Sequence, residues 1–174
     1  IPIDPKPDNF SHFSKNNVEI GPSQLALNEW EEEGLKLPNL HSMRQFRLNR
    51  IVGKLLGANL DGILLFDPLN IRYATDTTNM QLWNTHNPFR ACLVLANGYM
   101  VVWDYKNSPF LCDFNPLVKV VRSGASMFYF ATGDRSNEVA KNFAVQIKEL
   151  ITKYSSSDLR LAVDKIMIEG LRAL

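Results

Sequence analysis

The chain has 174 residues, 45% of them hydrophobic and 21% charged, a composition typical of a globular protein with one sizeable core. Its formal net charge of +1 is too small for the electrostatic footprint of a nucleic-acid-binding protein, and we expect no run of Lys and Arg to follow one face as phosphate binding would need. The longest apolar stretches, such as residues 91–96 and 99–103, are too short to cross a bilayer. We therefore expect neither nucleic acid nor a membrane as a partner.

The first 20 residues differ in composition from the rest of the chain. They contain three prolines, several Asn and Lys residues and no hydrophobic periodicity, which predicts an extended arm. Such arms often lie over a partner subunit. Residues 21–174 carry alternating helix and strand signals, and the chain ends at Leu174 within an expected helix. We interpret this part as one domain of a longer enzyme.

Helix signals follow the arm. Pro22 and Ser23 can begin a helix that carries an acidic run and ends near Gly34. A second helix is predicted for residues 40–56, where apolar side chains recur at helical spacing and Gly57 supplies the end.

Strand signals begin at residue 61. Residues 61–66 form a continuous apolar run between turn residues, which is typical of a central strand buried on both faces. The pattern then predicts a short second strand at residues 71–74 and a loop at residues 75–88. Asp67 and Asp76 bracket the short strand and are interpreted as turn or cap residues rather than catalytic carboxylates.

A hairpin is predicted next. Its strands are residues 90–95 and 99–105, and the Asn97-Gly98 pair between them suits the positive φ angles of a tight turn.

The remaining elements complete the fold class. Residues 117–121 and 159–163 are predicted strands, and residues 136–154 are a predicted amphipathic helix. Because helix-bridged parallel pairings coexist with an antiparallel hairpin, the sheet should be mixed, with helices on both faces. The predicted fold is a three-layer α/β/α domain with a central mixed sheet.

The side chains that could support catalysis are few. His12, His41 and His86 have no second His, Cys or carboxylate at metal-ligand spacing, so we expect no metal and no bound cofactor in this chain. There is no glycine-rich phosphate loop and no Gly-x-Ser-x-Gly elbow. Cys92 and Cys112 are expected to be free thiols in a reducing cytoplasm.

One loop carries the strongest signal for binding. Trp83 and His86 lie in its polar and aromatic sequence, and loops held by rigid strands often carry binding groups. The indole of Trp83 could cap an apolar pocket, anchor a subunit interface or present its π face to a cation. The sequence alone leaves these alternatives open. The aromatic residues considered together are Tyr73, Trp83, Phe89, Trp103, Tyr105 and Phe110.

Four segments carry a family resemblance. Residues 66–76 (FDPLNIRYATD), 79–90, 103–111 and 122–130 resemble the N-terminal domain of creatinase, prolidase and the aminopeptidases P. The longer runs are similar to one branch of that family, the dimethylsulfoniopropionate lyases. The resemblance covers about residues 19–174.

The resemblance implies a division of labour. In this family a second, C-terminal pita-bread domain holds a divalent metal pair through Asp, His and Glu ligands, and none of those positions exists in this chain. The N-terminal domain is implied to pack on its own catalytic domain, to build the homodimer and to cover the partner's active site. The residues implied to reach a small-molecule substrate are Tyr73, Met80, Trp83, Asn84 and His86.

The expected activity of the parent protein is a metal-dependent lyase reaction that cleaves dimethylsulfoniopropionate to dimethyl sulfide and acrylate. Two alternatives stay open: an Xaa-Pro metallopeptidase or creatinase-like hydrolase that shares the domain, and a binding or assembly module without catalysis.

Overall fold

The computed structural model describes residues 22–106, 108–123, 125–155 and 160–174. The predicted arm of residues 1–20 lies outside the described residues. The elements are α2 (Gln24–Glu32), α3 (Leu40–Gly57), β1 (Gly62–Leu65), α4 (Pro68–Thr75), α5 (Gln81–His86), β2 (Ala91–Leu95), β3 (Met100–Asp104), η2 (Pro109–Cys112), β4 (Val118–Ser123), α6 (Tyr129–Thr132), η3 (Gly133–Arg135), α7 (Ser136–Tyr154), β5 (Leu161–Val163) and α8 (Ile168–Ala173). Among the described helices, none is both long and apolar enough to cross a membrane.

The five strands form one mixed sheet in the order β4-β3-β2-β1-β5. The central pairs β1–β2 and β2–β3 are antiparallel, and the outer pairs β3–β4 and β1–β5 are parallel. The predicted mixed sheet is confirmed.

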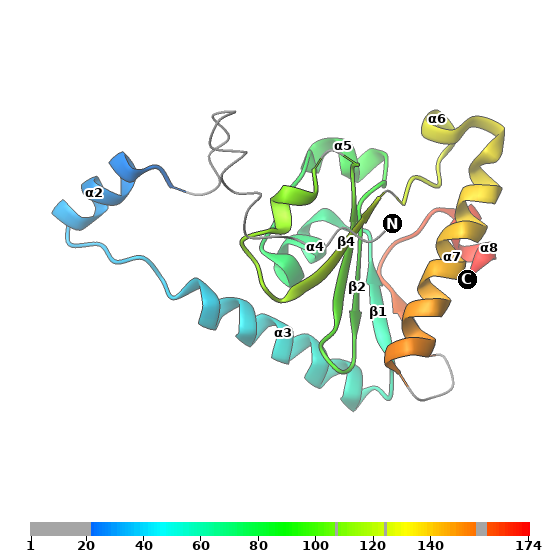
Figure 1. Ribbon diagram of the computed structural model, residues 1–174, viewed down its shortest axis with the longest axis horizontal. Helices are drawn as coiled ribbons and strands as arrows, with labels where there is room; N and C mark the ends of the chain where they lie inside the picture. Colours follow the sequence, from blue (N-terminus) through cyan, green and yellow to red (C-terminus); the bar gives the residue numbers. More distant parts are fainter. Residues whose placement is uncertain (1–21, 107, 124, 156–159) are drawn as a thin grey trace.

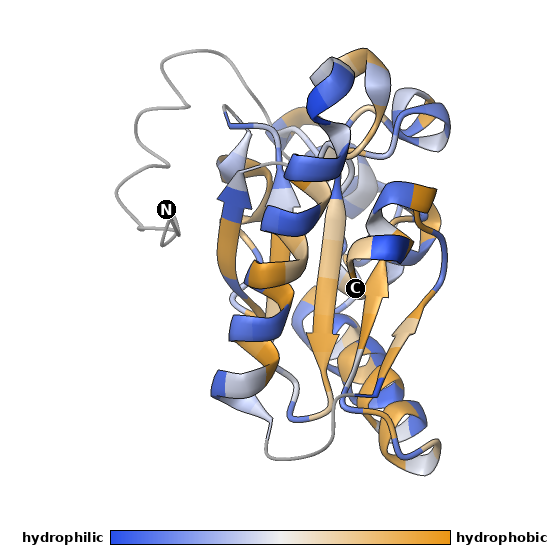
Figure 2. Cartoon of the chain, turned by 90° about the vertical axis from the view of Figure 1, so that its right-hand side faces the viewer, coloured by the Kyte–Doolittle hydropathy of each residue, from blue (hydrophilic) through white to orange (hydrophobic). Residues whose placement is uncertain are grey.

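Each central strand is buried on both faces because its side chains alternate between two cores. Leu64 pairs with Leu93, which pairs with Val101, and these side chains pack with helix α7. Leu65 pairs with Cys92, and both pack on the opposite face with residues of α3 and α4. Figure 1 shows α3 and α7 on either side of the sheet, and Figure 2 shows strands that are largely hydrophobic between amphipathic helices. The predicted three-layer α/β/α architecture is therefore confirmed.

The predicted strand at residues 71–74 is wrong, because these residues lie in helix α4. Asp67 caps this helix by accepting hydrogen bonds from the N–H groups of Leu69 and Asn70, at 2.9 and 3.2 Å. Pro68 occupies the first turn, where its missing N–H costs nothing. Ile71 and Thr75 are buried at helical spacing. The Asp-Pro signature was thus a helix start rather than only a turn.

The predicted loop at residues 75–88 is also partly wrong, because it contains the short helix α5. Met80 precedes α5 with φ 39° and makes no side-chain cap hydrogen bond. Without a capping residue or apolar periodicity, the sequence contains no start signal for this helix.

The hairpin is confirmed, but its turn differs from the predicted one. Of the Asn97-Gly98 pair only Gly98 has a positive φ, 83°. The Leu95 carbonyl accepts from Gly98 N–H at 2.8 Å, and Leu95 N–H donates to the Tyr99 carbonyl at 2.9 Å. This three-residue connection ends in a left-handed glycine, a common hairpin alternative to the two-residue turn.

We predict that the sheet core dominates stability. Leu64→Ala, at a fully buried position between β2 and α7, should lower the free energy of unfolding by about 2–5 kcal/mol, because it removes apolar contacts and leaves a cavity. Leu69→Ala makes the same chemical change at an exposed position and should alter the free energy of unfolding by less than about 0.5 kcal/mol. Denaturant unfolding measures both variants, and equal losses would contradict this assignment of the core.

Candidate functional site

A buried ion pair lies at one end of the hairpin. Arg90 directly precedes β2 and Asp104 ends β3, and the register that pairs Ala91 with Trp103 places them together. Arg90 Nε donates to Asp104 Oδ2 at 2.7 Å, and the two side chains are only 3% and 0% exposed. A pair this deeply buried is tolerated only if its remaining hydrogen-bonding groups also find partners.

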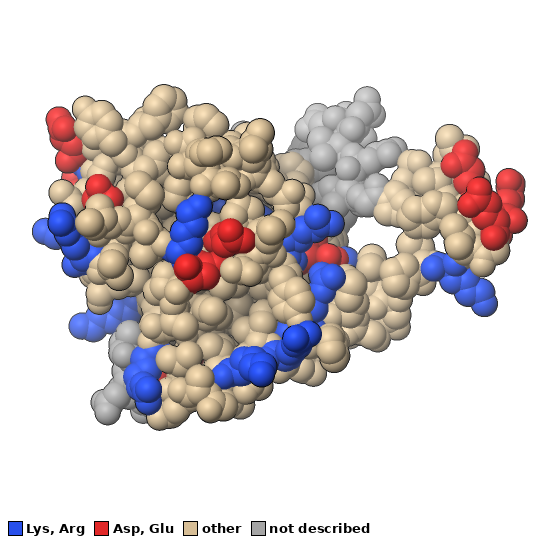
Figure 3. All heavy atoms as spheres, turned by 180° about the vertical axis from the view of Figure 1, so that it is seen from behind, with Lys and Arg blue, Asp and Glu red and all other residues tan. Residues whose placement is uncertain are grey.

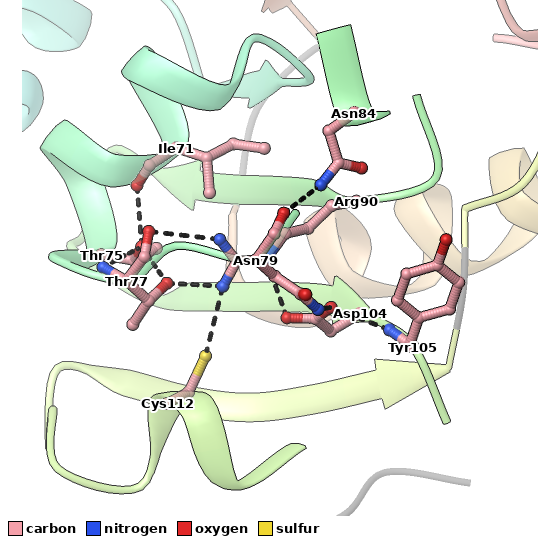
Figure 4. Close-up of polar contacts among 9 residues, drawn as sticks. All are labelled: Ile71, Thr75, Thr77, Asn79, Asn84, Arg90, Asp104, Tyr105 and Cys112. Atoms are coloured by element: carbon pink, nitrogen blue, oxygen red, sulfur yellow. Dashed lines mark hydrogen bonds and ion pairs between the residues drawn. The ribbon is translucent and has the colours of Figure 1, made fainter. Parts of the chain in front are cut away.

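Those remaining groups hold the segment between α4 and α5. Arg90 Nη2 donates to Thr77 Oγ1 at 2.5 Å, and Nη1 donates to the Thr77 carbonyl at 3.2 Å. Asn79 Nδ2 donates to Asp104 Oδ1 at 2.7 Å. Figure 4 shows the guanidinium and the carboxylate between the sheet and this segment. The ion pair therefore fixes the backbone that leads into α5.

Asn84 extends the same network into α5. Its side chain is buried, and its amide donates to the Asn79 carbonyl. Met80 lies between Asn79 and α5 in the left-handed region of φ and ψ, which residues other than glycine rarely adopt. A strained position of this kind persists only where the surrounding contacts determine it. Helix α5 is thus positioned by tertiary contacts rather than by its own sequence.

Trp83 is held in a defined orientation on α5. Its ring meets the Phe130 ring of α6 edge-on, with centroids 5.7 Å apart and an interplanar angle of 68°. Partial burial raises the pKa of Tyr105, and the neighbouring Trp83 side chain opposes that rise. Tyr105 in turn packs on buried Phe89, with ring centroids 3.5 Å apart.

Three of the five predicted site residues come together. Met80, Trp83 and His86 line one surface hollow of about 600 Å³. Its other lining residues are Gln81, Leu82 and Asn87. Trp83 remains 39% exposed, so part of its ring is free to meet another molecule.

The other two predicted site residues lie elsewhere. The ring of Tyr73 lies under the guanidinium of Arg47, 5.4 Å from its carbon, and lines a different hollow beside α3. Asn84 is 2% exposed and positions α5 instead of facing the hollow. Neither side chain lies at the hollow of Met80, Trp83 and His86, and their substrate-binding role stays a prediction.

The two aspartates that bracket α4 are structural. Asp67 is its N-cap, and Asp76 ends it in a left-handed conformation with φ 57°. Asp76 also accepts from Arg44 at 2.9 Å and from Arg47 at 3.2 Å, which joins α4 to α3. The interpretation of both residues as caps is confirmed.

The acidic residues and the thiols of the described segments can be compared with the requirements of a metal site and of a thiol nucleophile. Within these segments no three His, Cys, Asp or Glu side chains are grouped so that they could hold a metal ion. Cys92 and Cys112 are free and buried, and burial raises the pKa of both thiols, that of Cys112 to about 11. Thiols with raised pKa values stay protonated near neutral pH and are poor nucleophiles.

No family model matches the chain. The curated dimethylsulfoniopropionate lyases DddP of Roseovarius nubinhibens and Roseobacter denitrificans are 58% and 57% identical to it over 159 residues. Over this stretch the chain is closely similar in sequence to these two lyases. The match covers 91% of this chain but only 36% of each lyase, so the chain spans about a third of their length.

Solved structures are more distant. An Xaa-Pro aminopeptidase from Streptococcus pyogenes aligns with 71% of this chain at 11% identity, and one from Streptococcus thermophilus aligns with 74% at 16% identity. The two alignments cover 92% of the first aminopeptidase chain and 98% of the second, and each has a TM-score of 0.40. The resemblance to the lyase branch is confirmed by sequence identity alone.

The residues that hold the site in place were not predicted from the sequence. Arg90 and Thr77 carry no motif, and their contact depends on the fold bringing a loop over the hairpin. The contact between Trp83 and Phe130 likewise joins elements far apart in the chain. The sequence feature that could have found the ion pair is the opposite charge of Arg90 and Asp104 near the paired ends of the two predicted hairpin strands.

We predict that removing one partner of the buried ion pair destabilises the domain strongly. Arg90→Met should lower the free energy of unfolding by about 3–5 kcal/mol, because it leaves the Asp104 carboxylate buried without its cation. Arg135→Met removes the cation of an exposed pair with Glu138 and should change stability little. Urea unfolding of both variants checks this, and a stable Arg90→Met protein would contradict it.

Proposed function

We propose that the chain forms the dimer-building and substrate-covering domain of a metal-dependent lyase that acts on dimethylsulfoniopropionate. The observation that carries this proposal is the 58% identity to DddP over 91% of the chain. The proposal concerns the whole protein, of which this chain accounts for about a third by comparison with those relatives.

The geometry of α5 supports a covering role. Met80, Trp83 and His86 lie around one exposed hollow, while the ion pair of Arg90 and Asp104 fixes the approach to α5 from behind. A rigid support under an exposed aromatic surface suits a lid that must close in a defined position.

The chemistry of the substrate suits this surface. Dimethylsulfoniopropionate carries a carboxylate and a sulfonium cation, and a cation is attracted to the face of an indole ring, by about 2 kcal/mol when desolvated. In the elimination a base removes the proton α to the carboxylate and the bond between carbon and sulfur breaks. The electron pair leaves on dimethyl sulfide, and acrylate remains. Excluding water strengthens the electrostatic stabilisation of the charge that develops.

Metal binding is assigned to residues outside the described segments. Those segments offer no group of three metal-ligating side chains, so they do not fit the divalent pair that the family resemblance implies. No base and no cofactor is assigned to this chain either. Its role in the reaction is to bind, orient and shield the substrate.

The remaining parts of the proposal are the assembly and the location. We propose that the domain packs on its own catalytic domain and on a second copy in a homodimer, where α5 covers the partner's active site. The cytoplasm is the proposed location, which agrees with the two free thiols of Cys92 and Cys112. Nucleic acid and membrane partners are not part of the proposal.

The activity prediction uses the full-length protein. It should release dimethyl sulfide from dimethylsulfoniopropionate, measured by gas chromatography, and should leave Xaa-Pro dipeptides intact. The 174 residues alone should do neither with added divalent metals, because their described part has no ligand cluster. Cleavage of the dipeptides would favour the peptidase reading, and a full-length protein inactive on both would favour a binding module.

The site prediction concerns Trp83 in the full-length protein. Trp83→Ala should lower kcat/KM roughly 10- to 100-fold because it removes the ring beside the hollow, and Trp83→Phe should lose less because an aromatic face remains. Light scattering on the same samples reports the oligomeric state. Loss of the dimer with normal kinetics for the residual dimer would show that Trp83 only anchors the interface.

A further inference from the structure

Helix α2 has no partner among the described residues. It contains no buried residue, and every residue from 31 to 40 is exposed. Figure 1 shows α2 projecting far from the sheet at the end of an extended connection. The exposed apolar side chains Leu25, Trp30, Leu35 and Leu37 lie on this helix and connection. A short helix is not stable in water without burying an apolar face, so α2 requires a surface to pack on.

The helix is strongly acidic. It carries Glu29, Glu31 and Glu32, followed by Glu33, with no Lys or Arg between residues 22 and 35. Figure 3 shows these acidic side chains gathered on the projecting part of the molecule. Its partner surface should therefore be apolar with a positively charged rim.

Helix α3 supplies the opposite charge. Arg44, Arg47, Arg50 and Lys54 recur along it at helical spacing, and it carries no Asp or Glu. Figure 3 shows this row of basic side chains. This row corrects the expectation that no Lys and Arg residues line one face. These residues are three or four positions apart, so they do not form a visible run in the sequence. Arg44 and Arg47 bind Asp76, whereas Arg50 and Lys54 form no ion pair with any described residue.

An apolar groove runs beside these two cations. It is a hollow of about 600 Å³, and Arg50 and Lys54 lie along it. Its other lining residues are Ile51, Leu55, Ala58, Leu60, Ile63, Tyr73 and Ala162. Ala162 belongs to β5, the outermost strand of the sheet on that side. The groove thus has the apolar floor and the cationic rim that α2 requires.

We infer that α2 of one copy docks in the α3 groove of a second copy, and reciprocally. Each copy carries both surfaces, so one two-fold axis satisfies both helices. Docking on the same chain would require residues 33–39 to turn back along α3, whereas Figure 1 shows this connection running away from α3. Reaching Lys54, about 21 Å along the helix from Leu40, would take most of the roughly 25 Å that residues 33–39 span when fully extended.

This inference rests on the proposed homodimer and assigns the surfaces that hold it. It does not involve α5 or the hollow beside Trp83.

Cross-linking in the full-length protein tests the contact. Glu31→Cys on α2 and Lys54→Cys on α3 are prepared as separate proteins, mixed to exchange subunits and treated with a short bis-maleimide. Peptide mapping should find position 31 of one chain linked to position 54 of another in the mixture, and not in either protein alone. Cys92 and Cys112 are buried and should not react.

The outcomes separate the inference from the proposed function. A dimer by light scattering without this cross-link would overturn the α2 assignment and leave the proposed dimer standing. A monomeric wild-type protein would overturn both. If a variant with both cysteines is linked only within one chain, α2 folds back on its own groove and the inference is wrong.

Charge reversal gives a second, independent test. Arg50→Glu with Lys54→Glu should weaken the dimer at least tenfold in dissociation constant, by analytical ultracentrifugation, and Glu29→Lys with Glu31→Lys should restore it. Lys141→Glu with Lys148→Glu makes the same charge change on exposed positions of α7, across the sheet, and should leave dimerisation unchanged. If both charge reversals weakened the dimer equally, the effect would come from net charge alone, and the inference would be wrong.

Discussion

The buried ion pair between Arg90 and Asp104 is the constraint on which the candidate site depends. A guanidinium and a carboxylate taken out of water are costly unless every remaining donor and acceptor is satisfied, and here the satisfying groups belong to Thr77 and Asn79. The pair therefore contributes geometry more than stability. An apolar pair of similar volume could fill the same space, but it would not specify where the segment before α5 must lie. The position of the exposed hollow around Trp83 therefore depends on this buried ion pair.

The sequence predicted the elements whose structure depends on their own residues. It did not predict the elements whose structure depends on contacts with distant parts of the chain. Helix α3, strand β1 and the hairpin follow from periodicity and turn residues, because each buries an apolar pattern that is complete within the segment. Helix α4 was mistaken for a strand since Ile71 and Tyr73 favour strands, although the Asp67-Pro68 start argued for a helix. Helix α5 has no such start, and its shape depends on side chains that lie elsewhere in the chain. The same limit applies to the site: Met80, Trp83 and His86 were chosen because they share a loop, and they lie together, but only the fold could separate Tyr73 and Asn84 from them.

The two exposed apolar surfaces lie in different parts of the molecule. Figure 1 shows α5 and α6 near one end of the strands, and α3 running along one face of the sheet toward the other end. The proposed covering surface and the inferred docking surface can therefore act independently: docking of α2 would hold two copies together while α5 stays free to meet a substrate. A domain of modest size can therefore carry two exposed apolar surfaces, because a different partner would cover each of them.

The orientation of Trp83 shows how the domain could contribute to a reaction without supplying a catalytic group. Its ring meets Phe130 in a T-shaped contact and lies near Tyr105, and Tyr105 itself packs on Phe89. The indole therefore has its orientation set before any ligand arrives, with part of the ring left exposed. A side chain that is already ordered loses little entropy on binding, so more of the cation–π attraction would appear as binding or as transition-state stabilisation. By this argument the aromatic neighbours of Trp83 matter as much to the proposed lid as its own exposed ring.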